Sequence, residues 1–157
     1  MKRHIILGLA ISALSASVAI AQVAPEAVEY TDGAVAQSLT GTAGNPDEGK
    51  KIFGSRALGN CVGCHASEMT KDIPFPGTVG PVLDGAGDRW TEAQLRGIVA
   101  NAKMTFEGSV MPSFYKTSGY IRPGDAYTGK AGTEPLPPIL DAQQIEDVVS
   151  YLMTFKE

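Results

Sequence analysis

The chain has 157 residues, of which 43% are hydrophobic and 19% are charged. This length and composition are those of one globular domain, and they exclude a collagen-like or largely disordered chain. The formal net charge is −4 at pH 7. An acidic chain repels phosphate groups, so we expect neither nucleic acid nor an anionic membrane surface among its partners.

The first 21 residues have the features of a secretory signal peptide. Lys2 and Arg3 precede an apolar stretch over residues 5–20, and Ala19 and Ala21 form an A-x-A cleavage pattern. The stretch is shorter than the roughly 20 apolar residues that cross a bilayer, so we expect no membrane span in the mature protein. Cleavage after Ala21 would remove 21 of the 157 residues, leaving 136, and would lower the net charge from −4 to −6.

The two cysteines of the chain, Cys61 and Cys64, stand directly before His65, which would be the single histidine of the mature protein. This C-x-x-C-H run is the attachment sequence for haem in c-type cytochromes. Two thiols on one helical turn can reach the two vinyl groups at one porphyrin edge and form thioethers. The imidazole of the next residue can then bind the iron as its proximal ligand. We therefore predict one covalently bound haem c, held by Cys61 and Cys64 and ligated by His65.

Three other interpretations of the cysteine pair fit less well. A zinc site needs about four protein ligands, and the mature chain would offer no third cysteine and no second histidine. A thioredoxin-like redox pair belongs to a chain of alternating strands and helices, and the sequence shows no such alternation. A structural disulfide is compatible with export, but it leaves the adjacent histidine unexplained.

Residues 22–44 show no sustained hydrophobic period and are predicted to be an N-terminal extension or linker. The predicted haem-binding domain covers residues 45–157. Its first helix begins after Asn45, which can cap the helix while Glu48 completes a capping box. Residues 73–81 are rich in proline and glycine and are predicted to form a loop.

Two further helices are indicated by capping patterns followed by apolar residues at helical spacing. Thr91 with Gln94 begins the first, and Asp141 with Gln144 begins the second. The apolar positions are Leu95, Ile98, Val99 and Ala102 in the first helix and Ile145, Val148, Val149 and Leu152 in the second. No segment indicates a strand. The fold class is therefore predicted to be all-α, with short helices wrapped around one haem that supplies the apolar centre.

The second axial ligand has to come from a methionine, because the mature chain would have no further histidine. Met69 follows the cysteine motif too closely to reach the opposite haem face, and Met153 lies on the last predicted helix. Met104 and Met111 remain, at the two ends of one loop. Pro112 restricts Met111 to an extended backbone, and we favour Met111 over Met104. A histidine and a methionine fill both axial positions, which leaves the iron for one-electron transfer at a raised potential.

The C-terminal two thirds of the sequence resemble the class I cytochrome c family. Residues 49–53 are similar to that family's N-terminal helix, in which the glycine permits close crossing of the C-terminal helix. Residues 80–83 (Gly-Pro-Val-Leu) are similar to the loop beside the proximal histidine. The resemblance implies the class I cytochrome c fold. It also implies that Pro81 accepts the second N–H of the imidazole, that Pro81 and Leu83 lie at the haem, and that Arg89 faces a haem propionate.

Three runs narrow the resemblance to the SoxX family, the monohaem subunits of the SoxAX cytochromes of bacterial sulfur oxidation. They cover residues 60–65, 80–96 and 110–115, and the last contains a Met-Pro-x-Phe-Tyr element. The resemblance implies a periplasmic heterodimer with a SoxA-type cytochrome subunit that carries one or two haems. Such a complex is an L-cysteine S-thiosulfotransferase. It couples thiosulfate oxidatively to a cysteine of the carrier protein SoxYZ and passes electrons to a soluble cytochrome c.

The same resemblance assigns the substrate-handling cysteine to SoxA, so this chain would be the electron-transfer subunit. The residue census agrees with that division. Once Cys61 and Cys64 form thioethers and His65 binds iron, the mature chain would hold no free thiol nucleophile and no imidazole base. We therefore predict no catalytic nucleophile on this chain.

A freely diffusing class I cytochrome c electron carrier is the alternative function, since it would share every haem feature. The segment 116–138 distinguishes the two, because it is long, rich in proline and carries Tyr120 and Ile121 close to the favoured iron ligand. Loops above about 15 residues without regular structure are often functional. We expect this segment, with the region of Met111, to contribute to a stable partner interface.

Overall fold

The computed structural model describes residues 22–124 and 128–157, and the predicted signal peptide, residues 1–21, lies outside them. The α-helices in the described residues are α1 (Pro46–Gly54), α2 (Ala86–Arg89), α3 (Glu92–Asn101) and α4 (Ala142–Leu152). Short 3₁₀ helices are η1 (Pro25–Ala27), η2 (Cys61–Gly63), η3 (Glu68–Thr70) and η4 (Ala102–Met104). Extended pairing in the described ranges is limited to isolated bridges, Thr31–Ala34 and Gly124–Ala131. The all-α prediction is confirmed. No helix in the part of the chain that the structure describes is long and apolar enough to cross a membrane.

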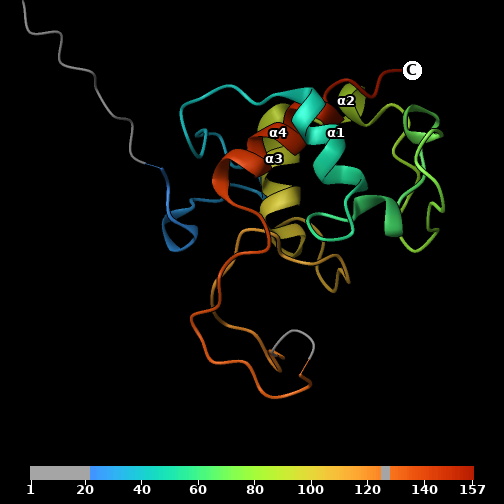
Figure 1. Ribbon diagram of the computed structural model, residues 1–157. Helices are drawn as coiled ribbons and strands as arrows, with labels where there is room; N and C mark the ends of the chain where they lie inside the picture. Colours follow the sequence, from blue (N-terminus) through green and yellow to red (C-terminus); the bar gives the residue numbers. More distant parts are fainter. Residues whose placement is uncertain (1–21, 125–127) are drawn as a thin grey trace, which may run out of the picture.

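Helices α1 and α4 cross at close range in the centre of the fold (Figure 1). A Cβ atom at Gly49 would lie 2.0 Å from the carbonyl oxygen of Asp147 and 2.7 Å from Cβ of Tyr151. Only glycine therefore allows this approach, as the resemblance implied. The buried rings of Phe53, Tyr151 and Phe155 pack beside the crossing, with centroids 4.9 to 6.0 Å apart.

The capping boxes predicted at the starts of α3 and α4 are both present. The box predicted at α1 is wrong. The Asn45 side chain caps the helix by accepting from the Glu48 N–H, but the Glu48 carboxylate pairs with Lys51 at 2.6 Å. The Asn45 N–H donates instead to Asp147 Oδ1 at 2.8 Å. The backbone group that Glu48 would have satisfied is therefore already bonded to α4.

Residues 22–44, which we call the N-terminal segment, lie packed against the helices. Val35 and Leu39 are buried in the hydrophobic core. The segment closes on itself through a hydrogen bond from the Val23 N–H to the Leu39 carbonyl, 2.8 Å long. It joins α3 through a hydrogen bond from the Val35 N–H to the Ala93 carbonyl, 2.9 Å long. The extension predicted from the sequence is thus a part of the packed structure.

A buried ion pair connects the N-terminal segment to both α3 and α4. Arg96 on α3 and Glu146 on α4 are 4% and 3% exposed, and Arg96 Nε lies 2.9 Å from Glu146 Oε1. Arg96 also donates to the Val35 carbonyl at 2.9 Å, and Glu146 accepts from the Leu39 N–H at 2.7 Å. Each charge is therefore satisfied by the other and by the backbone of the segment, which a buried pair needs if it is to be tolerated.

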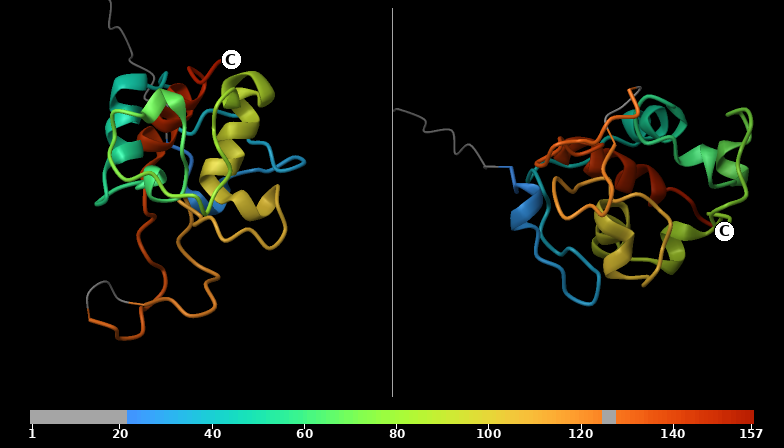
Figure 2. Two further views of the ribbon diagram at one scale, coloured as in Figure 1. Left: turned by 90° about the vertical axis from the view of Figure 1, so that its right-hand side faces the viewer. Right: turned by 90° about the horizontal axis from the view of Figure 1, so that it is seen from below.

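We call residues 116–138 the projecting loop; its described residues, 116–124 and 128–138, extend away from the helices (orange in Figures 1 and 2). The loop is held mainly by its own groups. The Glu134 carboxylate accepts from the N–H groups of Gly119 and Tyr120 at 3.1 and 2.8 Å. Ile121 is 98% exposed. The loop therefore presents apolar and aromatic side chains outside the hydrophobic core.

Candidate functional site

The cysteine motif occupies η2 and the residues that follow it. The His65 N–H donates to the Cys61 carbonyl at 2.9 Å, so the turn that carries the first thiol also positions the imidazole. Nδ1 of His65 lies 2.8 Å from the carbonyl oxygen of Pro81. A carbonyl only accepts hydrogen bonds, so Nδ1 carries the proton and Nε2 keeps its lone pair for a metal. This is the contact that the resemblance implied for Pro81.

Residues 77–83 run beside the cysteine motif in the same direction. Three backbone hydrogen bonds connect the two stretches. They run from the Gly77 N–H to the Val62 carbonyl (2.8 Å), from the Gly80 N–H to the Cys64 carbonyl (2.8 Å) and from the Leu83 N–H to the Ala66 carbonyl (3.0 Å). The predicted loop over residues 73–81 is confirmed, since no helix or strand forms there. Its end is a second backbone layer that holds the motif.

Gly80 allows this layer to approach the imidazole. A Cβ atom at Gly80 would lie 2.3 Å from Cε1 and 2.6 Å from Nδ1 of His65. A side chain there would push the neighbouring Pro81 carbonyl away from the ring. The sequence predicts a turn at this glycine, but composition does not show what the turn touches.

Asp84 fastens the end of the same loop to the residues after the motif. Its Oδ1 accepts from the Ser67 hydroxyl at 2.6 Å and from the Glu68 N–H at 2.8 Å. The Ser67 hydroxyl, followed by the Glu68 N–H, holds the pKa of the Asp84 carboxyl below its ordinary value. Leu83, the preceding residue, is partly buried against the hydrophobic core. The loop that carries Pro81 is therefore held at both ends.

The surroundings of the cysteine pair do not favour a redox-active dithiol. Burial raises the pKa of the Cys61 thiol to about 12. A redox Cys-x-x-Cys motif works through a thiol whose pKa is lowered, because the thiolate is the nucleophile. Cys61 and Cys64 are both partly buried, and no disulfide joins them. The thioredoxin-type interpretation therefore lacks its main electrostatic requirement.

Burial separates the candidate methionine ligands. Met111 is partly buried and packs against the core, whereas Met104 and Met69 are 49% and 44% exposed. Two hydrogen bonds hold the Met111 backbone. Its N–H donates to Ser109 Oγ at 3.2 Å, and its carbonyl accepts from Lys103 Nζ at 2.7 Å. A thioether on a fixed, partly buried backbone is better prepared to act as a ligand than an exposed one.

Arg89 ends the short helix α2 and contacts groups of its own chain. Its Nη1 donates to the Asp84 carbonyl and lies 3.6 Å from Glu157 Oε1. The side chain is about half exposed. A guanidinium has five N–H donors, so these contacts leave donors for a further anionic group.

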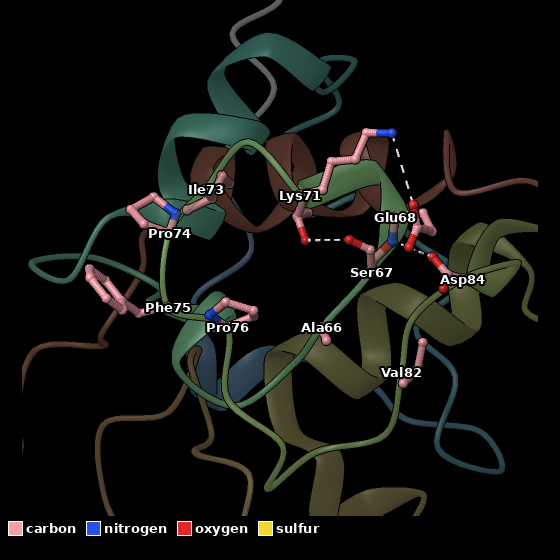
Figure 3. A pocket seen from close by; sticks show the side chains of 11 residues that line it. Ala66, Ser67, Glu68, Lys71, Ile73, Pro74, Phe75, Pro76, Val82 and Asp84 are labelled. Atoms are coloured by element: carbon pink, nitrogen blue, oxygen red, sulfur yellow. Dashed lines mark hydrogen bonds and ion pairs between the residues drawn. The ribbon is translucent and has the colours of Figure 1, made fainter.

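A pocket of about 550 Å³ lies beside the motif, lined by residues within 66–76 and by Val82 and Asp84 at the end of the following loop. Figure 3 shows Ile73 and Val82 on its walls and Phe75 turned outward at its edge. Neither cysteine of the motif lines it, and neither does His65. The pocket is therefore separate from the thiols and from the imidazole that would hold a porphyrin.

The donor set fits a haem c. Cys61 and Cys64 supply two thiols on one turn, and His65 supplies an imidazole with a free Nε2. Met111 supplies a thioether sulfur on a held loop. A porphyrin provides four nitrogen ligands, so the protein needs to add only two axial ones. Among the residues that the structure describes, no cluster of three or more His, Cys, Asp or Glu side chains is arranged to hold a metal ion.

Comparisons with known proteins complete this description. A search among curated proteins found no match. The family model for cytochrome c matches residues 46–156. A crystal structure of SoxXA from P. pantotrophus contains a chain that is 65% identical, with a TM-score of 0.84, over 87% of this chain and 100% of that one. With a family match over most of its length and this degree of identity, the chain belongs to the class I cytochrome c family, as a member of its SoxX group.

Proposed function

We propose that this chain is the electron-transfer subunit of a SoxAX-type L-cysteine S-thiosulfotransferase, and that it works in the periplasm paired with a SoxA-type cytochrome. The observation that carries the proposal is the His65–Pro81 hydrogen bond of 2.8 Å beside the two thiols of the motif. The 65% identity to a chain of SoxXA supports the choice of complex. The single haem would be ligated by His65 and Met111.

The residues of this chain would prepare both axial positions. Haem, when bound, supplies an iron that gains and loses one electron. The Pro81 carbonyl keeps the proton on Nδ1 of His65, so that Nε2 is a neutral donor of increased basicity. Gly80 leaves the space that this contact needs. Met111 offers a soft, neutral sulfur, which favours Fe(II) and therefore raises the reduction potential.

The reaction of the complex defines what an electron-transfer subunit has to do. A sulfur–sulfur bond forms between thiosulfate and a SoxYZ cysteine, the S–H bond of that cysteine breaks, and one proton and two electrons are released. A subunit that holds one haem would take the electrons one at a time and pass each to a soluble cytochrome c. The sulfur chemistry would use the cysteine of SoxA, because both cysteines of this chain are committed to the haem.

The projecting loop is the SoxA-binding surface that we favour. It leaves the domain directly after the Met111 region and exposes Ile121 almost completely. Tyr120 is braced for a fixed presentation, since its hydroxyl donates to the Lys116 carbonyl at 2.8 Å and Lys116 Nζ lies 5.0 Å from its ring centroid. Aromatic and arginine side chains are enriched in interface centres, and Arg122 adjoins this pair. A minimal, freely diffusing carrier would not need so long a loop beside its iron ligand.

Reconstitution with the partner tests the proposal. The haem-loaded chain, mixed with the SoxA subunit of its own host, should form a one-to-one complex in native mass spectrometry. Addition of SoxYZ and thiosulfate should then reduce the haem of this chain. A chain that stays monomeric and oxidised in this mixture would contradict the proposal and favour the diffusing carrier.

The loop is tested separately by Ile121→Ser. Loss of one exposed apolar anchor should weaken SoxA binding by about ten-fold, the scale of an interface hot spot, with an unchanged haem spectrum. Phe75→Ser is the control, because Phe75 is 79% exposed and lies outside the loop. Equal affinities of the two variants would remove the loop from the interface.

The ligand assignment is tested by a pair of methionine variants. Met111→Ala should open the sixth coordination position, abolish the iron–sulfur absorption band and lower the reduction potential. Met104→Ala should do neither. The covalent bond is tested by acid extraction into organic solvent, in which a thioether-linked haem stays with the protein.

A further inference from the structure

We propose that the N-terminal segment holds the iron ligand Met111 in place through Tyr115, which makes Tyr115 a positioning residue for the axial thioether. This inference rests on the proposed ligation by Met111. It assigns to residues 22–44 a role in the haem site, although none of them belongs to the cysteine motif or to residues 111–115, which we call the ligand segment.

The contacts of Tyr115 carry the inference. Tyr115 is 3% exposed and lies four residues after Met111. Its hydroxyl donates to the Val23 carbonyl at 2.6 Å, and its backbone N–H donates to the Ala100 carbonyl at 3.0 Å. One residue therefore ties the ligand segment both to the end of α3 and to the N-terminal segment. The Gln22 amide reaches the same hydroxyl at 3.4 Å.

Two further hydrogen bonds hold the residues between Met111 and Tyr115. The Ser113 hydroxyl donates to Asn101 Oδ1 at 2.7 Å. The Phe114 carbonyl accepts from the Leu140 N–H at 3.0 Å, just before α4. The hydrogen bond from the Tyr115 hydroxyl is a third contact, and its partner Val23 is 92 residues away in the chain.

Val23 is a fixed partner because it is itself held. Its N–H donates to the Leu39 carbonyl at 2.8 Å, and the Leu39 N–H donates to the buried Glu146 at 2.7 Å. Glu146 is paired with Arg96. A continuous series of hydrogen bonds therefore runs from the buried ion pair to the ligand segment.

This arrangement matters for a ligand that has to compete with others. A neutral thioether is a soft ligand and binds Fe(III) less strongly than Fe(II), so an external base displaces it when the ligand segment moves away from the iron. This opening of the ligand segment has to break the contacts of residues 111–115. A lost Tyr115–Val23 hydrogen bond therefore lowers the free energy of opening and raises the apparent affinity for the external base.

The test compares Tyr115→Phe with Tyr151→Phe in the full, haem-loaded ferric protein titrated with imidazole. Tyr151 is the matched control, because it is also buried, at 5% exposed, and its hydroxyl donates to the Met69 carbonyl at 3.4 Å, away from the ligand segment. Tyr115→Phe should bind imidazole about five-fold more tightly than the unaltered protein, the factor that one buried neutral hydrogen bond corresponds to. Tyr151→Phe should not change the affinity.

Two results would overturn the inference: an unchanged imidazole affinity in Tyr115→Phe, or an equal increase in both tyrosine variants, which would report only a general loss of stability. The Met111→Ala spectrum, recorded alongside, separates the two proposals. If Met111→Ala keeps the iron–sulfur band, the ligand assignment fails and the positioning role fails with it. If that variant loses the band while Tyr115→Phe behaves as the unaltered protein, the positioning role alone fails.

Discussion

The N-terminal segment and the projecting loop are equal in length, and their described residues are almost free of regular structure, yet they have opposite relations to the core. The segment, residues 22–44, buries Val35 and Leu39 and bonds the Arg96–Glu146 ion pair. The loop, residues 116–138, leaves the core and exposes Ile121. A stretch of chain without α-helices therefore packs into the domain when its backbone finds buried partners, and its composition does not reveal whether it will do so.

Among the described residues, a polar contact connects the two regions. The Thr117 hydroxyl, at the base of the projecting loop, donates to the Glu26 carboxylate of the N-terminal segment. This hydrogen bond is the main reason why the pKa of Glu26 lies below its ordinary value. The contact is exposed and contributes little to stability. It should therefore couple the two regions only weakly, and matched substitutions in each should show how differently the regions contribute to the free energy of unfolding.

The largest expected difference lies in the two arginines. Arg96→Ala should lower the free energy of unfolding by about 3–5 kcal/mol, because it leaves the Glu146 charge buried without its partner. Arg122→Ala, on the exposed part of the projecting loop, should change it by less than about 0.5 kcal/mol. Urea unfolding of both variants measures the contrast. Similar values for the two variants would abolish the distinction between the regions.

An apolar pair gives the next contrast. Leu39→Ala should destabilise the protein by about 3 kcal/mol through lost burial and a residual cavity. Ile121→Ala removes a side chain that is already exposed to water and should leave the unfolding free energy within about 0.5 kcal/mol. Thermal unfolding followed at one probe for both variants is sufficient. A stable Leu39→Ala variant would show that the segment detaches at little cost.

A third substitution removes the internal support of the loop. Glu134→Ala deletes the acceptor of the Gly119 and Tyr120 N–H groups. We expect hydrogen exchange at these two amides to accelerate by about ten-fold, as fits the loss of charge-assisted hydrogen bonds in solvent, and SoxA binding to weaken. The unfolding midpoint should not move. Unchanged exchange would mean that the loop is ordered by contacts other than Glu134.

The last expected effect is confined to alkaline pH. Burial raises the pKa of Tyr30, in the N-terminal segment, from 10.0 to about 12. The folded state therefore keeps the phenol proton more firmly than the unfolded state does. This contribution to stability is complete below pH 10 and is lost as the pH rises toward 12. Between these values the unaltered protein should lose stability relative to Tyr30→Phe. Parallel unfolding curves of the two proteins across this range would contradict the prediction.

Sequence reasoning was most successful where the determinants are local. The capping boxes of α3 and α4 depend on residues three positions apart, and both are present. The contact between His65 and Pro81 is also present, although the two residues are 16 positions apart. It was predicted from the family resemblance and not from a local pattern. The roles of Met111, Leu83 and Arg89 at the haem stay predictions.

The remaining features depend on partners that are far apart in the chain. Arg96 and Glu146 are 50 residues apart, and charged residues on predicted helices are ordinarily placed in solvent. Val35 and Leu39 follow no helical or strand period, so pattern analysis has no basis for burying them. The error at Glu48 has the same origin. The capping pattern assigned the Asn45 N–H to the Glu48 side chain, but this N–H donates to Asp147, which is distant in the sequence.

The bonding of the N-terminal segment also decides where this domain begins for practical purposes. The cytochrome c family model starts at residue 46, and a recombinant protein trimmed to that limit would keep every α-helix and every proposed iron ligand. It would also strip the Val35 carbonyl and the Leu39 N–H from the Arg96–Glu146 pair. The limit of the family model and the limit of the packed structure therefore differ in this protein. Truncation experiments, domain fusions and purification tags should be designed from Gln22 onward.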